Sequence, residues 1–158
     1  LYVEADATQL HQVLMNLCTN AWHALRGSTG RIELVLEALD LSAGVPDELH
    51  LPPGHYARIA VRDTGCGMDE TTRRRMFDPF FTTKPVNEGT GLGLAVVQGI
   101  VAEHHGAITV DSAPGHGTTV SIYLPQATEP GSGEAEIAAA DAVTRGAGEH
   151  VLYVDDDE

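Results

Sequence analysis

The segment that most constrains the fold is residues 9–25, QLHQVLMNLCTNAWHAL, whose pattern predicts one amphipathic helix. Its apolar side chains recur every three or four residues, which is the spacing of a single buried helical face. At about 100° per residue, a polar column lies beside that face, made of Gln9, Gln12, Asn16, Asn20 and His23. Such a column borders either solvent or a cleft, and the helix alone does not distinguish the two.

Composition excludes several classes of function. The 158 residues have a formal net charge of −14. Nine acidic residues and one basic residue lie within residues 126–158, so most of this charge belongs to the C-terminal part. An acidic chain is unsuited to nucleic-acid binding, whereas a phosphate can still be held by backbone amides and a divalent cation. No apolar run has the length of a membrane span, so we expect no membrane contact.

The cysteines indicate the compartment. Cys18 and Cys66 provide neither a disulfide framework nor metal-binding spacing, which favours a reducing, cytoplasmic setting. The chain begins without Met, and we interpret it as a fragment of a longer protein. Whether that parent protein is anchored in a membrane stays open.

The rest of the chain alternates strand and helix patterns. Alternation of apolar residues predicts strands at residues 31–39, 56–62, 107–112 and 118–124. Helices are predicted at residues 69–75 and 92–105. These elements predict an α/β two-layer sandwich, in which helices cover one face of a sheet. Residues 126–149 are rich in Gly, Ala and Glu and are expected to form a flexible linker.

Glycine clusters occur at three junctions: Gly65 and Gly67, then Gly89, Gly91 and Gly93, then Gly115 and Gly117. Each cluster alone is typical of a tight turn. The second, however, opens a helix, whose free N–H groups and dipole favour a phosphate. Asp63 precedes the first cluster and offers a carboxylate acceptor for the exocyclic amine of adenine. Asn20 offers an amide oxygen, which suits a Mg²⁺ ion held mainly by phosphates.

Five segments together resemble a known family. NLCTNAWHAL, DTGCGM, FDPFFTTK, GTGLGL and GHGTT resemble, in the same order, the N, G1, F, G2 and G3 boxes of sensor histidine kinases. The resemblance covers residues 1–125 and is specific because all five boxes occur in order. It implies the Bergerat ATP-binding fold, in which about three helices cover one face of a mixed β-sheet. ATP would lie between the two layers, under a mobile lid formed by residues 76–90.

The resemblance also implies roles for individual residues. Asn20 matches the family's Mg²⁺ ligand, Asp63 its adenine-recognising aspartate, and Thr118 the hydroxyl that completes the adenine pocket. Asn20 and Lys84 are the residues expected to act in catalysis. Lys84 is expected at the γ-phosphate, with an ordinary solvated loop lysine as the alternative. The residues expected to bind the nucleotide are Asn16, Asn20, His23, Asp63, Gly65, Gly67, Thr82, Thr83, Lys84, Thr90, Gly91, Leu92, Gly93, Leu94 and Thr118.

One position favours a kinase over an ATPase. ATPases of this fold carry a Glu, one helical turn before the Mg²⁺ asparagine, that positions the attacking water. Here that position is Asn16, a poor base. We therefore expect a protein-histidine kinase catalytic domain of a two-component system, which transfers the γ-phosphate to a histidine on a separate dimerisation domain. A Bergerat-fold ATPase and a non-catalytic nucleotide-sensing module are the alternatives.

The C-terminal residues 150–158, HVLYVDDDE, resemble the first strand of a response-regulator receiver domain. Asp155 and Asp156 match the acidic pair that binds Mg²⁺ in such domains. This resemblance implies a hybrid histidine kinase with a receiver domain as a further partner. An ordinary acidic terminus is the alternative.

Overall fold

The computed structural model describes residues 1–27, 29–46, 49–84 and 89–127. The described residues belong to one compact unit of the chain, Leu1–Thr128. The expected linker beyond residue 127 and the expected receiver strand, with Asp155 and Asp156, lie outside the described residues. Among those that are described, no helix has the length and apolar character needed to cross a membrane.

Four strands form one sheet in the order β1-β2-β4-β3. Their bounds are β1 (Ile32–Asp40), β2 (His55–Asp63), β3 (Ala107–Ser112) and β4 (Thr118–Pro125). All three neighbouring pairs are antiparallel. We expected a mixed sheet, and the described strands contain no parallel pair. The reason is that β4 pairs with both β2 and β3 and so separates these two strands, which run in the same direction.

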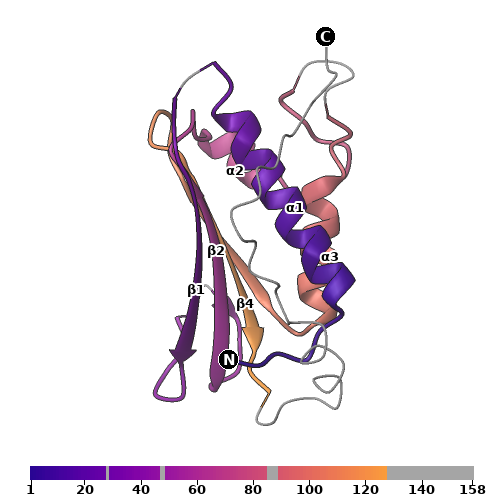
Figure 1. Cartoon of the computed structure of the whole chain (residues 1–158), viewed down its shortest axis with the longest axis vertical. Helices are drawn as coiled ribbons and strands as arrows, with labels where there is room; N and C mark the ends of the chain where they lie inside the picture. Colours follow the sequence, from indigo (N-terminus) through magenta and orange to yellow (C-terminus); the bar gives the residue numbers. More distant parts are fainter. Residues whose placement is uncertain (28, 47–48, 85–88, 128–158) are drawn as a thin grey trace, which may run out of the picture. The chain divides into compact units, whose positions relative to one another are not determined.

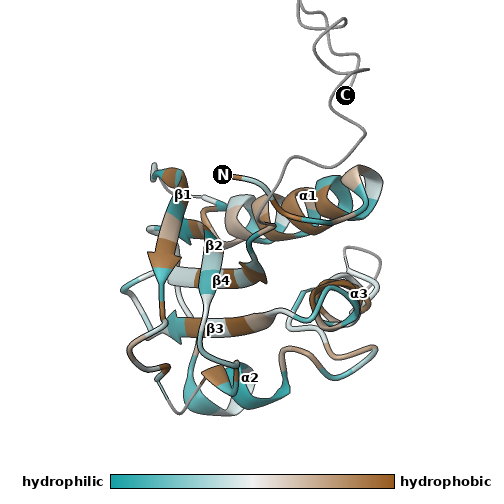
Figure 2. Cartoon of the chain, turned by 90° about the horizontal axis from the view of Figure 1, so that it is seen from below, coloured by the Kyte–Doolittle hydropathy of each residue, from teal (hydrophilic) through white to brown (hydrophobic). Residues whose placement is uncertain are grey.

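Three described helices complete the fold: α1 (Ala7–Ala24), α2 (Glu70–Arg75) and α3 (Gly93–Glu103). α1 and α3 lie on one face of the sheet (Figure 1), and the expected α/β two-layer sandwich is confirmed. Figure 2 shows apolar residues, in brown, recurring along both helices and the strands. The core cluster unites Val13 and Leu17 of α1 with Val97 of α3 and Ile122 of β4. Burial of such side chains is the main stabilising contribution to the fold.

Polar contacts join the start of α1 to the end of α3. Asp6 caps α1, since its carboxylate accepts the N–H groups of Thr8 and Gln9 at 2.7 and 3.2 Å. The Asp6 N–H donates to His104 Nε2 at 3.2 Å. His104 Nδ1 lies 2.8 Å from the Ile100 carbonyl oxygen, so the ring bridges the two helices. These contacts therefore link the two helices at the start of α1 and the end of α3.

Candidate functional site

A cavity of about 760 Å³ lies between α1, the start of α3 and the ends of β2 and β4. Its volume is within the range of small-molecule and cofactor sites. One wall is apolar and includes Leu17, Val61, Met68, Met76 and Val120. The polar residues on the remaining walls come from segments that are far apart in the sequence. This combination of an apolar wall and a few convergent polar groups is typical of a binding site for a flat, partly polar ligand.

Most of the residues expected from the sequence line this cavity. They are Asn16, Asn20, His23, Asp63, Gly67, Thr82, Thr83, Lys84, Thr90, Gly91, Gly93, Leu94 and Thr118. Gly65 and Leu92 do not line it. Gly65 packs against the backbone of Ala24, and its N–H donates to Asp63. Leu92 is the N-cap residue of α3 and is partly exposed to solvent.

Asp63 lies at the end of β2 and is only 6% exposed. Its Oδ1 accepts the Gly65 N–H at 2.8 Å. Burial raises the pKa of this carboxyl, and hydrogen bonds from the backbone of Gly65 and Thr118 act in the opposite direction. In the β2–β4 register Asp63 is directly opposite Thr118, so the two side chains share one face of the sheet. The carboxylate and the hydroxyl therefore form one polar end of the cavity.

The hairpin between β3 and β4 holds this polar end in place. Gly117 has a φ of +77°, and a Cβ at this position would clash with the Asp63 carbonyl oxygen. Only glycine therefore permits this approach of the hairpin to β2. The Gly115 N–H donates to the Cys66 carbonyl oxygen at 2.7 Å, which joins the hairpin to the loop that follows Asp63.

The start of α3 forms the opposite end of the cavity. Gly91 has a φ of +65°, and its carbonyl oxygen accepts the Phe80 N–H at 2.9 Å. The N-cap residue Leu92 has no side-chain acceptor for the N–H groups of the first turn. These groups and the helix dipole favour an anion. A Cβ built on Gly93 would lie 3.0 Å from Asn16 Oδ1, so the Asn16 amide is next to this helix start.

Asn20 and Lys84 both line the cavity and contact each other. Lys84 Nζ donates to Asn20 Oδ1 at 2.9 Å in a partly buried position. An amide oxygen such as Asn20 Oδ1 is a suitable hard ligand for a Mg²⁺ ion that is held mainly by phosphates. No group of three or more His, Cys, Asp or Glu side chains in the described part of the chain is arranged to hold a metal ion. A Mg²⁺ ion at Asn20 would thus depend on oxygens of the ligand.

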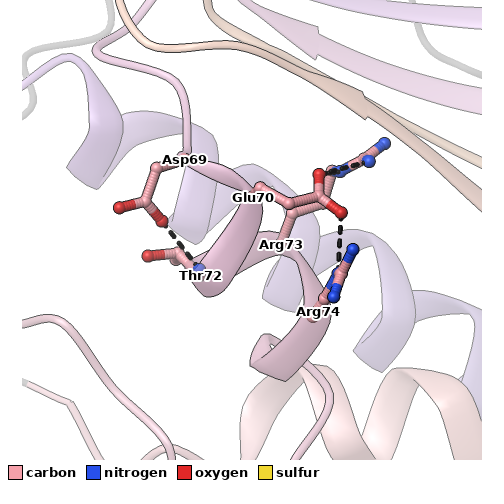
Figure 3. A network of polar contacts seen from close by, with 5 residues as sticks. All are labelled: Asp69, Glu70, Thr72, Arg73 and Arg74. Carbon is pink, nitrogen blue, oxygen red and sulfur yellow. Dashed lines mark hydrogen bonds and ion pairs between the residues drawn. The ribbon is translucent and has the colours of Figure 1, made fainter.

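The short helix α2 is stabilised by polar contacts between its own residues and its N-cap (Figure 3). The Asp69 carboxylate accepts the Thr72 N–H at 2.7 Å, and this bond keeps the pKa of Asp69 below its ordinary value. Glu70 forms ion pairs with Arg74 and Arg73, which lower the pKa of its carboxyl. Thr72 of this helix also lines the cavity.

Sequence reasoning missed most of the apolar wall. Met68, Met76 and Phe81 line the cavity, although each was seen only as part of a motif or of the lid. Cys66 and Thr72 were missed as well. A signal existed, because a ligand with an aromatic ring needs apolar side chains beside the acceptor for its polar edge. Apolar side chains of this kind occur in the sequence close to Asp63.

A family model described as "Histidine kinase-, DNA gyrase B-, and HSP90-like ATPase" matches residues 5–128. Among curated proteins, the chain is 40% identical over 130 residues to "Sensor kinase CckA" of Brucella abortus, covering 80% of this chain and 13% of that protein. It is 42% identical over 123 residues to "Sensor histidine kinase ZraS" of Escherichia coli, covering 78% of this chain and 23% of that protein. The chain thus spans less than a quarter of the length of these relatives.

Solved structures give the same relationship. "Mycobacterial sensor histidine kinase MprB" has a TM-score of 0.59 and 31% identity, over 78% of this chain and 74% of that one. "Catalytic domain of histidine kinase ThkA" has a TM-score of 0.61 and 33% identity, over 78% and 70% of the two chains. A structure of full-length ShkA in complex with AMPPNP has a TM-score of 0.63 and 31% identity, over 80% of this chain and 23% of that one.

Proposed function

Because the chain belongs to the histidine kinase-, DNA gyrase B- and HSP90-like ATPase family, in which it is homologous to sensor histidine kinase catalytic domains, we propose that its cavity binds Mg²⁺·ATP and presents the γ-phosphate to a histidine. The observation that carries this proposal is the meeting of three features in one cavity. They are the buried Asp63, the Asn20–Lys84 pair and the start of α3.

The adenine ring is placed at the Asp63 end. The Asp63 carboxylate can accept a hydrogen bond from the exocyclic amine, and Met68 and Met76 offer apolar contacts to the ring. A guanine ring would direct a carbonyl oxygen at the same carboxylate and would be repelled. This end of the cavity therefore favours adenine.

The phosphates are placed at the start of α3. Gly91 and Gly93 leave the backbone N–H groups accessible, and Thr82, Thr83 and Thr90 add hydroxyl groups nearby. Lys84 is positioned to contact the γ-phosphate once it leaves Asn20. Asn20 would hold a Mg²⁺ ion together with phosphate oxygens, and this ion would neutralise part of the phosphate charge.

A histidine kinase is favoured over an ATPase by the acid–base groups of the cavity. Asp63 is the one carboxylate among the described lining residues, and it lies at the adenine end. The residue beside the start of α3 is the neutral amide of Asn16, which cannot take a proton from water. The γ-phosphate is therefore retained for a histidine on a separate domain.

The partners follow from this reaction. We assign residues 1–125 to the catalytic domain, residues 126–149 to a linker, and residues 150–158, with Asp155 and Asp156, to a receiver domain. The phosphoacceptor histidine would come from a dimerisation domain of the parent protein. A cytoplasmic location is in keeping with Cys18 and Cys66, which are both free thiols.

Calorimetric titration of the chain with ATP tests the binding step. We expect Mg²⁺-dependent binding of ATP, weaker binding of GTP, and a loss of roughly tenfold or more in ATP affinity for Asp63→Asn, since a charge-assisted hydrogen bond contributes about 1.5–3 kcal/mol. Equal ATP affinity of the wild type and this variant would contradict the role of Asp63. No binding of ATP to the folded wild type would contradict the proposed function itself.

A further inference from the structure

Ser112, the last residue of β3, does not line the cavity but contacts three segments that build its adenine end. Its hydroxyl accepts the Met68 N–H at 2.9 Å and donates to the Gly117 carbonyl oxygen at 3.0 Å. It also lies 3.0 Å from the Thr118 hydroxyl. One side chain therefore joins the loop after β2, the β3–β4 hairpin and the first residue of β4.

The number of hydroxyl protons decides which group is the donor in each of these hydrogen bonds. A serine hydroxyl has one proton to donate and two lone pairs to accept. The Gly117 carbonyl oxygen can only accept, so the Ser112 proton is directed there. The Met68 N–H occupies one lone pair of Ser112. All three contacts are satisfied together only if the Thr118 hydroxyl donates its proton to the other lone pair.

This arrangement leaves Thr118 as an acceptor on the side of the cavity. Its proton is engaged behind it, on Ser112, while its free lone pairs remain available to a ligand. Asp63, directly opposite on β2, is also an acceptor when ionised. A base that presents an amino group meets two acceptors here, whereas a base that presents a carbonyl oxygen finds no side-chain donor at this pair.

We propose that Ser112 is a positioning residue that keeps the Thr118 hydroxyl in the accepting orientation and so strengthens the selection of an amino-purine over an oxo-purine. This inference rests on the proposed function, because it concerns the base of the nucleotide in the same cavity. It adds a residue behind the cavity to the recognition of adenine, beside Asp63 and Thr118.

The test compares ATP with inosine triphosphate, which carries an oxo group in place of the amino group. Both affinities are measured by calorimetry for the wild type and Ser112→Ala. Without Ser112, the Thr118 hydroxyl can rotate and donate to the inosine carbonyl. We expect the ratio of ATP affinity to inosine triphosphate affinity to fall by roughly three- to tenfold, the effect of one redirected hydrogen bond. Ser112→Thr, which keeps a hydroxyl, is expected to restore the ratio.

A matched control separates positioning from stability. Ser121 in β4 is a buried serine whose hydroxyl lies 3.0 and 3.2 Å from two nitrogens of Arg58. Since side chains alternate along a strand, Ser121 is on the opposite face from Thr118. Ser121→Ala is expected to lower the melting temperature, as Ser112→Ala does, and to leave the affinity ratio unchanged.

The double variant Ser112→Ala, Thr118→Val completes the cycle. Once the hydroxyl at residue 118 is gone, Ser112→Ala should not change the ratio further. The inference would be overturned if Ser112→Ala had the same ratio of ATP affinity to inosine triphosphate affinity as the wild type. It would also be overturned if Ser112→Ala lowered this ratio equally with and without the Thr118 hydroxyl. The proposed ATP binding would stand in both cases. If Ser112→Ala does not fold, Ser112→Cys, with its weaker thiol donor and acceptor, is expected to lower the ratio, and an unchanged ratio would overturn the inference. Failure of the wild type to bind ATP would instead remove the proposed function and this inference with it.

Discussion

Lys84 Nζ donates a hydrogen bond to Asn20 Oδ1 at 2.9 Å, so the ammonium group of a loop residue occupies the amide oxygen that we assign to Mg²⁺. Under this proposed role of Asn20, the Lys84 ammonium group and Mg²⁺ would compete for the same oxygen. Binding of Mg²⁺·ATP should therefore move Lys84 away from Asn20. The nearest new source of negative charge would be the terminal phosphate.

The role of Lys84 predicts a difference between ATP and ADP. Lys84→Ala would remove the proposed charge-assisted contact to the γ-phosphate, a group that ADP lacks. We expect ATP affinity to fall by roughly tenfold or more and ADP affinity to change much less. Titration of the variant with both nucleotides measures this difference.

Arg74→Ala is the matched control for this variant, because it also removes one positive charge. Arg74 is exposed and paired with Glu70 on α2. It should leave the ratio of ATP affinity to ADP affinity unchanged. If Lys84→Ala lowers both affinities equally, Lys84 contributes only general charge and not a contact to the γ-phosphate.

The two asparagines of α1 should differ in metal dependence. Asn20→Ala is expected to abolish the gain in ATP affinity that Mg²⁺ gives to the wild type, because it removes the proposed ligand. Asn16→Ala should be milder, since the Asn16 amide lies against the start of α3. ATP titrations with Mg²⁺ and with EDTA test both variants. Identical behaviour would indicate that both side chains are only part of a polar flank.

The raised pKa of Asp63 predicts a pH dependence of stability. The ordinary carboxyl pKa is about 3.9, and burial raises the pKa of Asp63 in the folded state. The folded state therefore binds this proton more tightly than the unfolded state. As the pH rises from the ordinary value through the raised value, the contribution of Asp63 to the free energy of unfolding falls.

Denaturant unfolding of wild type and Asp63→Asn at several pH values measures this contribution. The variant lacks the titrating group, so the stability of the wild type minus that of the variant should decrease with rising pH. Carboxyls with lowered pKa values, such as those of Asp69 and Glu70, have the opposite trend, but they are present in both proteins and cancel in the difference. A difference that is independent of pH would contradict the raised pKa.

Much of the fold could be predicted because it depends on local periodicity. The helix expected at residues 9–25 is observed as Ala7–Ala24, and the strand expected at residues 107–112 is observed with the same bounds. The pairing of the strands could not be obtained in this way. Periodicity shows that a strand is half-buried, but it does not show which strand lies beside it. The insertion of β4 between β2 and β3 depends on the tertiary structure.

The candidate site, like the fold, could be predicted where it depends on local spacing and could not be predicted where it depends on tertiary contacts. Asn16, Asn20 and His23 were found together because one helix places them on one side. Asp63 was found because it stands between a predicted strand and the glycines Gly65 and Gly67, where the family resemblance implies an adenine-binding carboxylate. The contact of Ser112 with Thr118 was not foreseen, because it depends on the twist and register of a hairpin rather than on spacing. The partnership of Lys84 with Asn20 was not foreseen for the same reason, since a loop brings these residues together.

No carboxylate among the described lining residues lies beside the start of α3, which predicts weak hydrolysis of ATP. Asn16→Glu would introduce a carboxylate beside the start of α3, and positioned general-base catalysis contributes about 10²–10⁴-fold. The neighbouring polyphosphate would raise the pKa of this new carboxyl and reduce its ionised fraction near the phosphates. We therefore expect near-background phosphate release from the wild type and at most a modest gain in the variant.

The fate of the γ-phosphate tests the central claim most directly. The chain is incubated with Mg²⁺ and ATP labelled at the γ-phosphate, with and without the dimerisation domain of the parent protein, and both free phosphate and acid-labile phosphohistidine are measured. A histidine kinase catalytic domain should label the histidine of the added domain and release little phosphate on its own. Sustained phosphate release by the chain alone, surviving removal of contaminating ATPases and without labelling of the histidine, would contradict the account and indicate an ATPase.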